Sequence, residues 1–284
     1  MVALTRALEA PRLTSHALFP VLVVVYLTLM TLIGTRVVVP LFGWGSGILP
    51  AEYDNDAFGA RLARWDSGYY LTIANEGYSA DGAERAFFPL YPLLVRWLSA
   101  FTGISVLWCG KLLSIVCFLC AAWLLHRWLL DEFDSTTASW GMAWFCLFPM
   151  SFYLVAFYPE ALFLLAAIAS IYAARRGRFV AAGMAIAIAG ATRPVAFLLA
   201  VPYVFEFVLQ RDFRRRCLAE FAGGALLAPL GTLCYLAYLS IQAGGGDPVA
   251  HYHSNLEAHW RMATTWPWQT LERAFRSALY GEGI

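Results

Sequence analysis

The sequence predicts an all-α polytopic membrane protein, a bundle of about seven transmembrane helices, from its composition, its apolar runs and its loop charges. Of the 284 residues, 60% are hydrophobic and only 14% are charged, whereas a soluble domain carries about 25% charged residues. A water-soluble globule of this composition would have too little polar surface to cover it. The net charge of +1 excludes broad electrostatic attraction to nucleic acid, so no nucleic-acid partner is expected.

Apolar runs that approach or exceed the length of a membrane helix, about 20 residues, recur along the chain. The predicted spans are 13–35 with an apolar extension to about Phe42, 104–130, 135–159, 161–174, 179–192, 194–210 and 221–246. We interpret the first as a retained span, because a signal peptide has a shorter apolar core. The fifth and sixth meet at Arg193-Pro194, and proline disfavours helix at the residue before it. We therefore expect two shorter helices meeting at Arg193.

The short loops 175–178 (RRGR) and 211–216 (RDFRRR) are the densest in arginine, and the positive-inside rule places them and the N-terminus in the cytoplasm. Working along the spans places four parts outside: 43–103, Tyr158–Glu160, Arg193 and everything after Gly244. Most acidic residues fall in these parts, which favours the same orientation. Residues 1–284 are thus expected to form a single integral membrane domain, with an outer loop (43–103) and an outer C-terminal segment (244–284).

Ionisable groups near the membrane are functional candidates, because they are costly there. The first is Asp66 in RWDSGYYLTIANEGY, 64–78, where helical spacing puts it on one face with Tyr69 and Tyr70. Desolvation on such a face raises a carboxyl pKa and suits a general base. The structural alternative is a helix N-cap, with Trp65 and the tyrosines as interfacial anchors. Spacing alone leaves both interpretations open.

Two further outer motifs contain prolines. The segment 87–97, FFPLYPLLVRW, is typical of an interfacial helix on the outer leaflet, with Tyr91 facing a cleft or, alternatively, serving only as a membrane anchor. Glu160 follows Tyr158-Pro159 at the outer end of a span. Its place in a first helical turn complements the helix dipole, and the functional alternative is contact with an acceptor sugar or with an arginine.

Arg193 offers a guanidinium fork for a lipid phosphate, or an ion pair with Glu160 or Asp66. The outer C-terminal segment combines charged and aromatic side chains of the kind that recognise sugars, among them Asp247 and Arg261. Its histidines match no zinc signature, and no phosphate-cradling glycine loop occurs. No metal and no cofactor is therefore expected.

Five motifs follow one another over residues 61–270: RWDSGYYLTIANEGY, FFPLYPLL, SFYLVAFYPEALFLL, ATRPVAFLLAVP, and GDPVA followed by HWR and WPW. In this order they resemble the PIG-V-like mannosyltransferases, relatives of GPI mannosyltransferase 2 that include bacterial members. The resemblance implies a GT-C-like glycosyltransferase bundle with membrane-parallel helices in the first outer loop. It also implies a polyprenyl-phosphate sugar donor, typically polyprenyl-phosphate mannose, and a lipid-linked or envelope glycan acceptor.

The resemblance implies Asp66 as the catalytic base of a single inverting displacement. Phosphate departure needs a cation, here Arg193 or Arg64. Together the residues and the resemblance yield these candidate substrate contacts: Arg64, Trp65, Tyr91, Tyr158, Glu160, Arg193, Asp247 and Arg261. The expected location is the plasma membrane of a bacterium, where membrane lipids surround the spans and the active site faces outward.

Family members are usually longer, with further spans after the outer segment. Either this chain is a compact member, or a C-terminal part is missing, and a partner subunit is one source of it. The alternatives to an enzyme are a noncatalytic scaffold subunit of a glycosyltransferase complex and a lipid or solute transporter. A transporter predicts paired halves and spans interrupted near mid-membrane, whereas the candidates here gather at one face. The enzyme predicts that Asp66, Glu160 and Arg193 converge.

Overall fold

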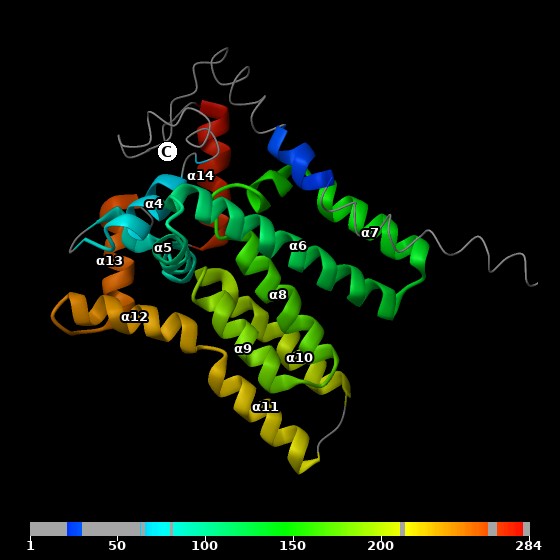
Figure 1. Cartoon of the computed structure of the whole chain (residues 1–284). Coiled ribbons are helices and arrows are strands. Elements are labelled where there is room, and N and C mark those ends of the chain that lie inside the picture. Colours follow the sequence, from blue (N-terminus) through cyan, green and yellow to red (C-terminus); the bar gives the residue numbers. More distant parts are fainter. Residues whose placement is uncertain are drawn as a thin grey trace, which may run out of the picture.

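The computed structural model describes residues 22–29, 63, 66–79, 82–210, 214–260 and 266–280. All regular structure among these residues is helical (Figure 1), which confirms the all-α class. Two helical stretches, Val106–Glu132 and Arg215–Gln242, are long and apolar enough to cross a membrane. Of the first predicted span, only 22–29 is described, and it is helical. The count of seven spans remains a prediction.

Four helices make up the central stack: α6 (Val106–Glu132), α8 (Glu160–Arg175), α9 (Phe179–Gly190) and α11 (Arg215–Leu227). Helix α8 packs against both α6 and α9, and α9 packs against α11. The last contact depends on glycine, because a side chain at Gly183 would collide with the backbone of Gly224. Small residues of this kind let the backbones of membrane helices approach closely.

The surface of this stack is apolar where a soluble protein would be polar. Large side chains on several helices stand exposed, including Trp123, Trp144, Phe197 and Leu226, each at least 69% accessible. Lipid tails are a favourable solvent for such side chains, whereas water is not. The exposed surface thus agrees with the composition in supporting a transmembrane protein.

Prolines interrupt two of the predicted spans. Helix α7 (Ser135–Leu147) ends before Pro149, and the 3₁₀ helix η5 (Pro149–Leu154) follows it. The expectation of one continuous helix over 135–159 is therefore wrong, because proline lacks the backbone N–H that a helix interior requires. Pro229 similarly separates α11 from α12 (Leu230–Gln242).

The predicted break at Arg193 is confirmed. Helix α9 ends at Gly190, and Arg193 has an extended backbone with φ −152° and ψ 142°. The chain then resumes as η6 (Pro194–Leu199) and α10 (Ala200–Gln210). The extended residue is the one that precedes proline, as steric conflict with the proline ring requires.

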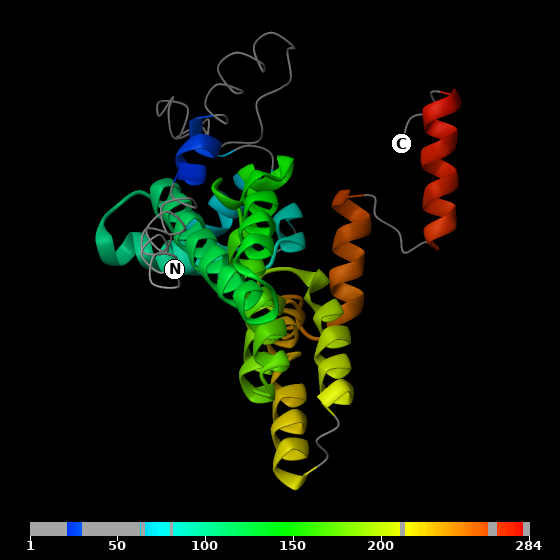
Figure 2. The same cartoon turned by 90° about the vertical axis from the view of Figure 1, so that its right-hand side faces the viewer.

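The remaining elements gather near one end of the stack: α4 (Ser67–Asn75), η4 (Ala83–Ala86), α5 (Leu90–Thr102) and α13 (Pro248–Trp260). Helix α5 is amphipathic, since it buries Tyr91 and Val95 while Trp97 and Phe101 stand exposed. This pattern suits the interfacial helix predicted over 87–97, whose depth in the membrane stays a prediction. Helix α14 (Pro267–Tyr280) stands apart from the rest in Figure 2.

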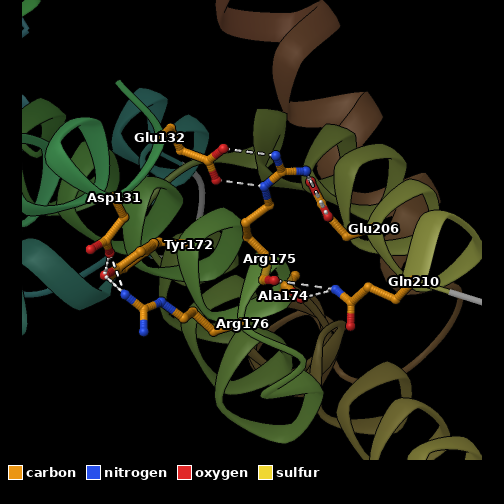
Figure 3. A network of polar contacts seen from close by, with 8 residues as sticks. All are labelled: Asp131, Glu132, Tyr172, Ala174, Arg175, Arg176, Glu206 and Gln210. Atoms are coloured by element: carbon orange, nitrogen blue, oxygen red, sulfur yellow. Dashed lines mark hydrogen bonds and ion pairs between the residues drawn. The ribbon is translucent and has the colours of Figure 1, made fainter. Parts of the chain in front are cut away.

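Ion pairs hold the opposite end, where α6, α8 and α10 finish together. Arg175 donates to both carboxylate oxygens of Glu132, at 2.7 and 2.9 Å, and to Glu206 at 3.3 Å. Figure 3 shows its guanidinium between the two glutamates. Beside it, Arg176 and Tyr172 both donate to Asp131. This arginine network lies next to the RRGR loop, at the end that the sequence analysis assigns to the cytoplasm.

Candidate active site

Asp66 stands at the start of α4, where an N-cap residue belongs, but its side chain makes no capping hydrogen bond. Its backbone is already helical, with φ −62° and ψ −14°, whereas a capping residue usually adopts an extended conformation. The structural alternative for this aspartate thus loses its support. The carboxylate thus makes no hydrogen bond to the helix that it precedes, and the residue is partly open to solvent.

The pKa of Asp66 is raised above its ordinary value, mainly because surrounding protein desolvates the carboxylate. The positive charge of Arg193 acts in the opposite direction and lowers the pKa. Desolvation therefore outweighs the attraction of the arginine. A carboxyl with a raised pKa is a stronger base, as proton abstraction requires.

Arg193 forms an ion pair with Glu160, the first residue of α8. Among the described residues, the Glu160 oxygen Oε1 is the only acceptor for the Arg193 guanidinium. The second oxygen of Glu160, Oε2, is buried and has no hydrogen-bond partner in the described part of the chain. Within the described part of the chain, the other N–H groups of the guanidinium thus have no acceptor, next to a carboxylate oxygen without a partner.

The structure therefore brings together three charged groups that are remote in sequence. Arg193 is close enough to attract the carboxylates of both Glu160 and Asp66, and these two carboxylates repel each other. Glu160 begins α8 and Arg175 of the arginine network ends it, so the cluster and the network lie at opposite ends of this helix. This convergence is the one that the enzyme hypothesis predicts.

Buried tyrosines lie close to these groups. Tyr70 is buried and packs edge-on against Tyr91 and Tyr158, with ring centroids 5.8 and 6.5 Å apart. Tyr158 is buried as well. We expected Tyr91 to face a cleft, and the structure instead buries its side chain completely. The Tyr91 hydroxyl donates to the Gly110 carbonyl at 2.9 Å, so this ring packs between Tyr70 and α6.

An aromatic wall of Tyr69, Phe87 and Trp260 lies near Asp66. Tyr69 stacks on Phe87 at a centroid distance of 4.8 Å, and Trp260 from α13 contacts both rings at 5.3 and 5.6 Å. Tyr69 and Trp260 are partly exposed. Trp260 belongs to the HWR motif, whose sequence alone does not identify the rings that Trp260 contacts.

The segment 82–87 is held by Tyr78 and by side chains from the distant helices α12 and α13. Five side chains donate hydrogen bonds to carbonyls of residues 82–87: Tyr78 to Phe87, Tyr235 to Arg85, Tyr252 to Ala86, Asn255 to Gly82 and Trp260 to Ala83. Their donor–acceptor distances run from 2.6 to 3.4 Å. Sequence reasoning missed these residues. For the four donors other than Tyr78, the clustering of tyrosine, asparagine and tryptophan after position 234 was the available signal, but it does not identify the acceptors.

A family model described as mannosyltransferase (PIG-V) matches residues 14–224. The chain belongs to the PIG-V mannosyltransferase family. All three converging groups lie within the matched residues, whereas α12 and α13 lie beyond them.

Similar proteins carry related names. GPI mannosyltransferase 2 of Yarrowia lipolytica is 26% identical over 208 residues, which are 68% of this chain and 56% of that protein. GPI alpha-1,6-mannosyltransferase 2 of Rattus norvegicus is 32% identical over 157 residues, covering 49% of this chain and 31% of that protein. The chain thus matches about half or less of the length of these relatives. No solved structure matches it at a significant level.

The other candidate contacts of this family member do not join the cluster or fall outside the described residues. Asp247 lies at the start of α13, where its Oδ1 accepts a hydrogen bond from the Val249 amide at 2.9 Å. Trp260 ends the same helix, about 20 Å away at 1.5 Å per residue. Arg64, Trp65 and Arg261 lie outside the described residues. Within the described part of the chain, no group of three metal-ligating residues is found.

Proposed function

We propose that this member of the PIG-V mannosyltransferase family is a glycosyltransferase that moves a sugar, mannose by family, from a polyprenyl-phosphate donor to a lipid-linked or envelope glycan acceptor. The observation that carries the proposal is the convergence of Asp66, Glu160 and Arg193 at one end of an apolar bundle. A donor of this class keeps its prenyl chain in lipid while its sugar reaches the membrane boundary. A site at the end of the bundle suits such a donor.

Asp66 acts as the general base. Its carboxylate accepts the proton of the acceptor hydroxyl while the hydroxyl oxygen attacks the anomeric carbon of the donor sugar. The bond between that carbon and the phosphate oxygen breaks, and the polyprenyl phosphate leaves with the electron pair. The displacement inverts the anomeric carbon in one step and needs no covalent intermediate. The products are the glycosylated acceptor and a polyprenyl phosphate.

Arg193 stabilises the charge that develops on the departing phosphate. The ion pair with Glu160 engages one terminal nitrogen of the guanidinium. This contact orients the group and leaves its other N–H donors for phosphate oxygens, which a guanidinium binds in a fork. Positioned cations of this kind contribute most where charge appears in the transition state.

The proposed location is a multi-pass position in a bacterial plasma membrane, with the N-terminus in the cytoplasm and the site outside. The arginine network supports this orientation, because it lies at the Arg175 end of α8 whereas Glu160 of the site begins that helix, and arginine-rich loops stay in the cytoplasm. A polyprenyl-phosphate donor presented outside would reach the site laterally from the lipid.

The test uses membranes that contain the full chain, supplied with polyprenyl-phosphate mannose, and mass analysis of lipid-linked and envelope glycans. We expect mannosylated product from the unaltered protein and a loss of at least about 100-fold for Asp66→Asn, the scale of general-base catalysis. Asp134→Asn is the matched control, because Asp134 also precedes a helix but accepts capping hydrogen bonds. Asp134→Asn should retain full transfer.

Retained transfer by Asp66→Asn would remove this residue as the base. The extent of the match to longer relatives favours one second candidate, a noncatalytic subunit of a glycosyltransferase complex. In that case membranes gain transfer only when a partner subunit is present, and Asp66→Asn changes nothing in the complex.

A further inference from the structure

The segment 155–159, between η5 and α8, is irregular and yet buried. Val155, Ala156, Phe157 and Tyr158 are each at most 6% exposed. Non-helical backbone inside a membrane protein has to find its hydrogen-bond partners within the protein, because lipid supplies none. The carbonyl groups of this segment therefore need identified donors.

Three side chains donate to three of these carbonyls, and the Ala156 carbonyl accepts from the Tyr158 amide at 2.9 Å. The Lys111 ammonium donates to the Val155 carbonyl at 3.2 Å, and Ser114 donates to the Tyr158 carbonyl at 3.0 Å. Both come from α6, one helical turn apart. Ser67, on α4, donates to the Phe157 carbonyl at 2.9 Å. All three donors are buried.

Lys111 is the only lysine in the chain, and it is 6% exposed within an apolar helix. An ionisable side chain at such a position is costly and marks a functional site by default. The same part of α6 also fits the segment closely, because a side chain at Gly110 would collide with the Phe157 ring. A costly buried lysine next to a glycine that the same segment requires indicates that the position of residues 155–159 against α6 is important.

The contacts connect the two halves of the candidate site. Ser67 directly follows Asp66, and its acceptor Phe157 lies three residues before Glu160. The helix that presents Asp66 is thus tied to the segment that leads into Glu160, which in turn pairs with Arg193. A shift of residues 155–159 would change the separation between the carboxylate of Asp66 and the guanidinium of Arg193.

We propose that Lys111, Ser114 and Ser67 are positioning residues that hold residues 155–159 and thereby set the placement of the Glu160–Arg193 pair relative to Asp66. The inference rests on the proposed function, since it assigns these residues to the geometry of the same site. The three side chains act through backbone carbonyls and do not touch the substrate.

The test compares the unaltered chain in membranes or lipid nanodiscs with Lys111→Met and Ser114→Ala. Ser170→Ala is the matched control, because Ser170 is as buried as Ser114 but its hydroxyl donates to Ala167 of its own helix at 2.8 Å. The first readout is hydrogen exchange of the peptide 148–160. We expect exchange about tenfold faster in Lys111→Met, a smaller increase in Ser114→Ala, and no change in Ser170→Ala.

The second readout is sugar transfer per folded molecule, with folded protein measured separately. We expect kcat to fall about tenfold in Lys111→Met while KM stays within about twofold, because a misplaced charge pair weakens the transition state more than it weakens donor binding. A merely structural lysine would reduce the amount of folded protein and leave kcat per folded molecule intact. If Lys111→Met does not accumulate, Ser114→Ala supplies the same comparison.

The two readouts keep this inference separate from the proposed function. If Lys111→Met and Ser114→Ala match Ser170→Ala in exchange and in kcat, the positioning role is overturned. If the unaltered protein transfers no sugar, the proposed function fails, and the positioning role for catalysis fails with it. Unchanged hydrogen exchange in the variants would in that case also show that Lys111 and Ser114 do not hold residues 155–159. Faster local exchange would show that they do.

Discussion

The two ends of the helical bundle treat their charged residues differently. At one end, the Arg175 guanidinium donates from three nitrogens, to Glu132 and to Glu206. At the other, Arg193 donates from one nitrogen to Glu160 among the described residues. A fully engaged guanidinium stabilises contacts between helices, whereas a partly engaged one keeps donors for a ligand. The presence of an arginine therefore does not by itself separate a structural role from the proposed ligand-binding role. The number of its N–H groups that are already paired is the feature that separates them.

The aspartates at two helix starts show the same contrast. Asp134 accepts hydrogen bonds from the Thr136 and Thr137 amides, at 2.9 and 3.1 Å. Hydrogen bonding, first of all from the Thr137 side chain, lowers the pKa of Asp134. Asp66 caps nothing, and desolvation raises its pKa despite the nearby Arg193. One carboxylate is used by its own helix, and the other makes no capping bond, as its proposed role as a base requires.

The largest expected effect is on Arg193. Arg193→Gln should lower sugar transfer by at least about 100-fold, because it removes the cation next to the leaving phosphate. The matched change at the other end, Arg175→Gln, should lower the thermal stability of the protein and leave transfer per folded molecule unchanged. Both variants are compared by transfer assays and by thermal unfolding in the same membranes. Equal losses of transfer in the two variants would break the contrast between the ends.

The pH dependence of transfer tests the same arrangement. Asp66 has to be ionised to accept a proton, so transfer is lost as the pH falls through its pKa. Because that pKa is raised from 3.8, the acid limb of the pH profile should lie above this value. Arg193 lowers the pKa, so the residual transfer of Arg193→Gln should show an acid limb at higher pH than that of the unaltered protein. If the acid limb lies at the same pH in Arg193→Gln and in the unaltered protein, the charge of Arg193 does not lower the pKa of Asp66.

Stability should respond in the opposite sense at the two aspartates. Asp134→Ala removes an N-cap and should lower the Tm, as loss of a capping side chain does. Asp66→Ala removes no capping bond and should leave the Tm unchanged or raise it, since the raised pKa means that folding disfavours the ionised carboxylate. A carboxyl group whose pKa is higher in the folded state than in the unfolded state lowers the free energy of unfolding at pH values above its unfolded-state pKa. Calorimetry at neutral pH and at pH 4 separates the two, because the difference at Asp66 should shrink in acid.

Much of this arrangement follows from local rules that the sequence makes visible. The break at Arg193 follows from Pro194, and the mostly helical class follows from composition and apolar runs. Three partners were open for Arg193, namely a lipid phosphate, Glu160 and Asp66, and only tertiary packing shows the ion pair with Glu160, which is compatible with a phosphate ligand. Pro149 shows the opposite case, since an uncharged run concealed a helix end that the proline rule would have revealed.

The supports of the site were out of reach of such rules. Lys111 and its acceptor Val155 are 44 positions apart, and nothing in either local segment indicates the other. The burial of Tyr91 likewise depends on how α5 packs against α6. Residues that carry charge at a helix end are recognisable from sequence, whereas residues that hold a backbone carbonyl become visible only once the helices are placed.

The smallest expected effect concerns the aromatic wall. Trp260→Phe keeps an aromatic ring beside Tyr69 but loses the indole N–H that donates to the Ala83 carbonyl at 3.1 Å. Loss of one such hydrogen bond, about 1 kcal/mol, should raise KM for transfer about fivefold and leave kcat nearly unchanged. Trp128→Phe is the control from the arginine network end, where Trp128 stacks on Tyr172 at 6.0 Å, and it should leave KM unchanged. An equal rise in KM from both changes would mean that aromatic packing throughout the bundle, rather than α13 at the site, determines substrate binding.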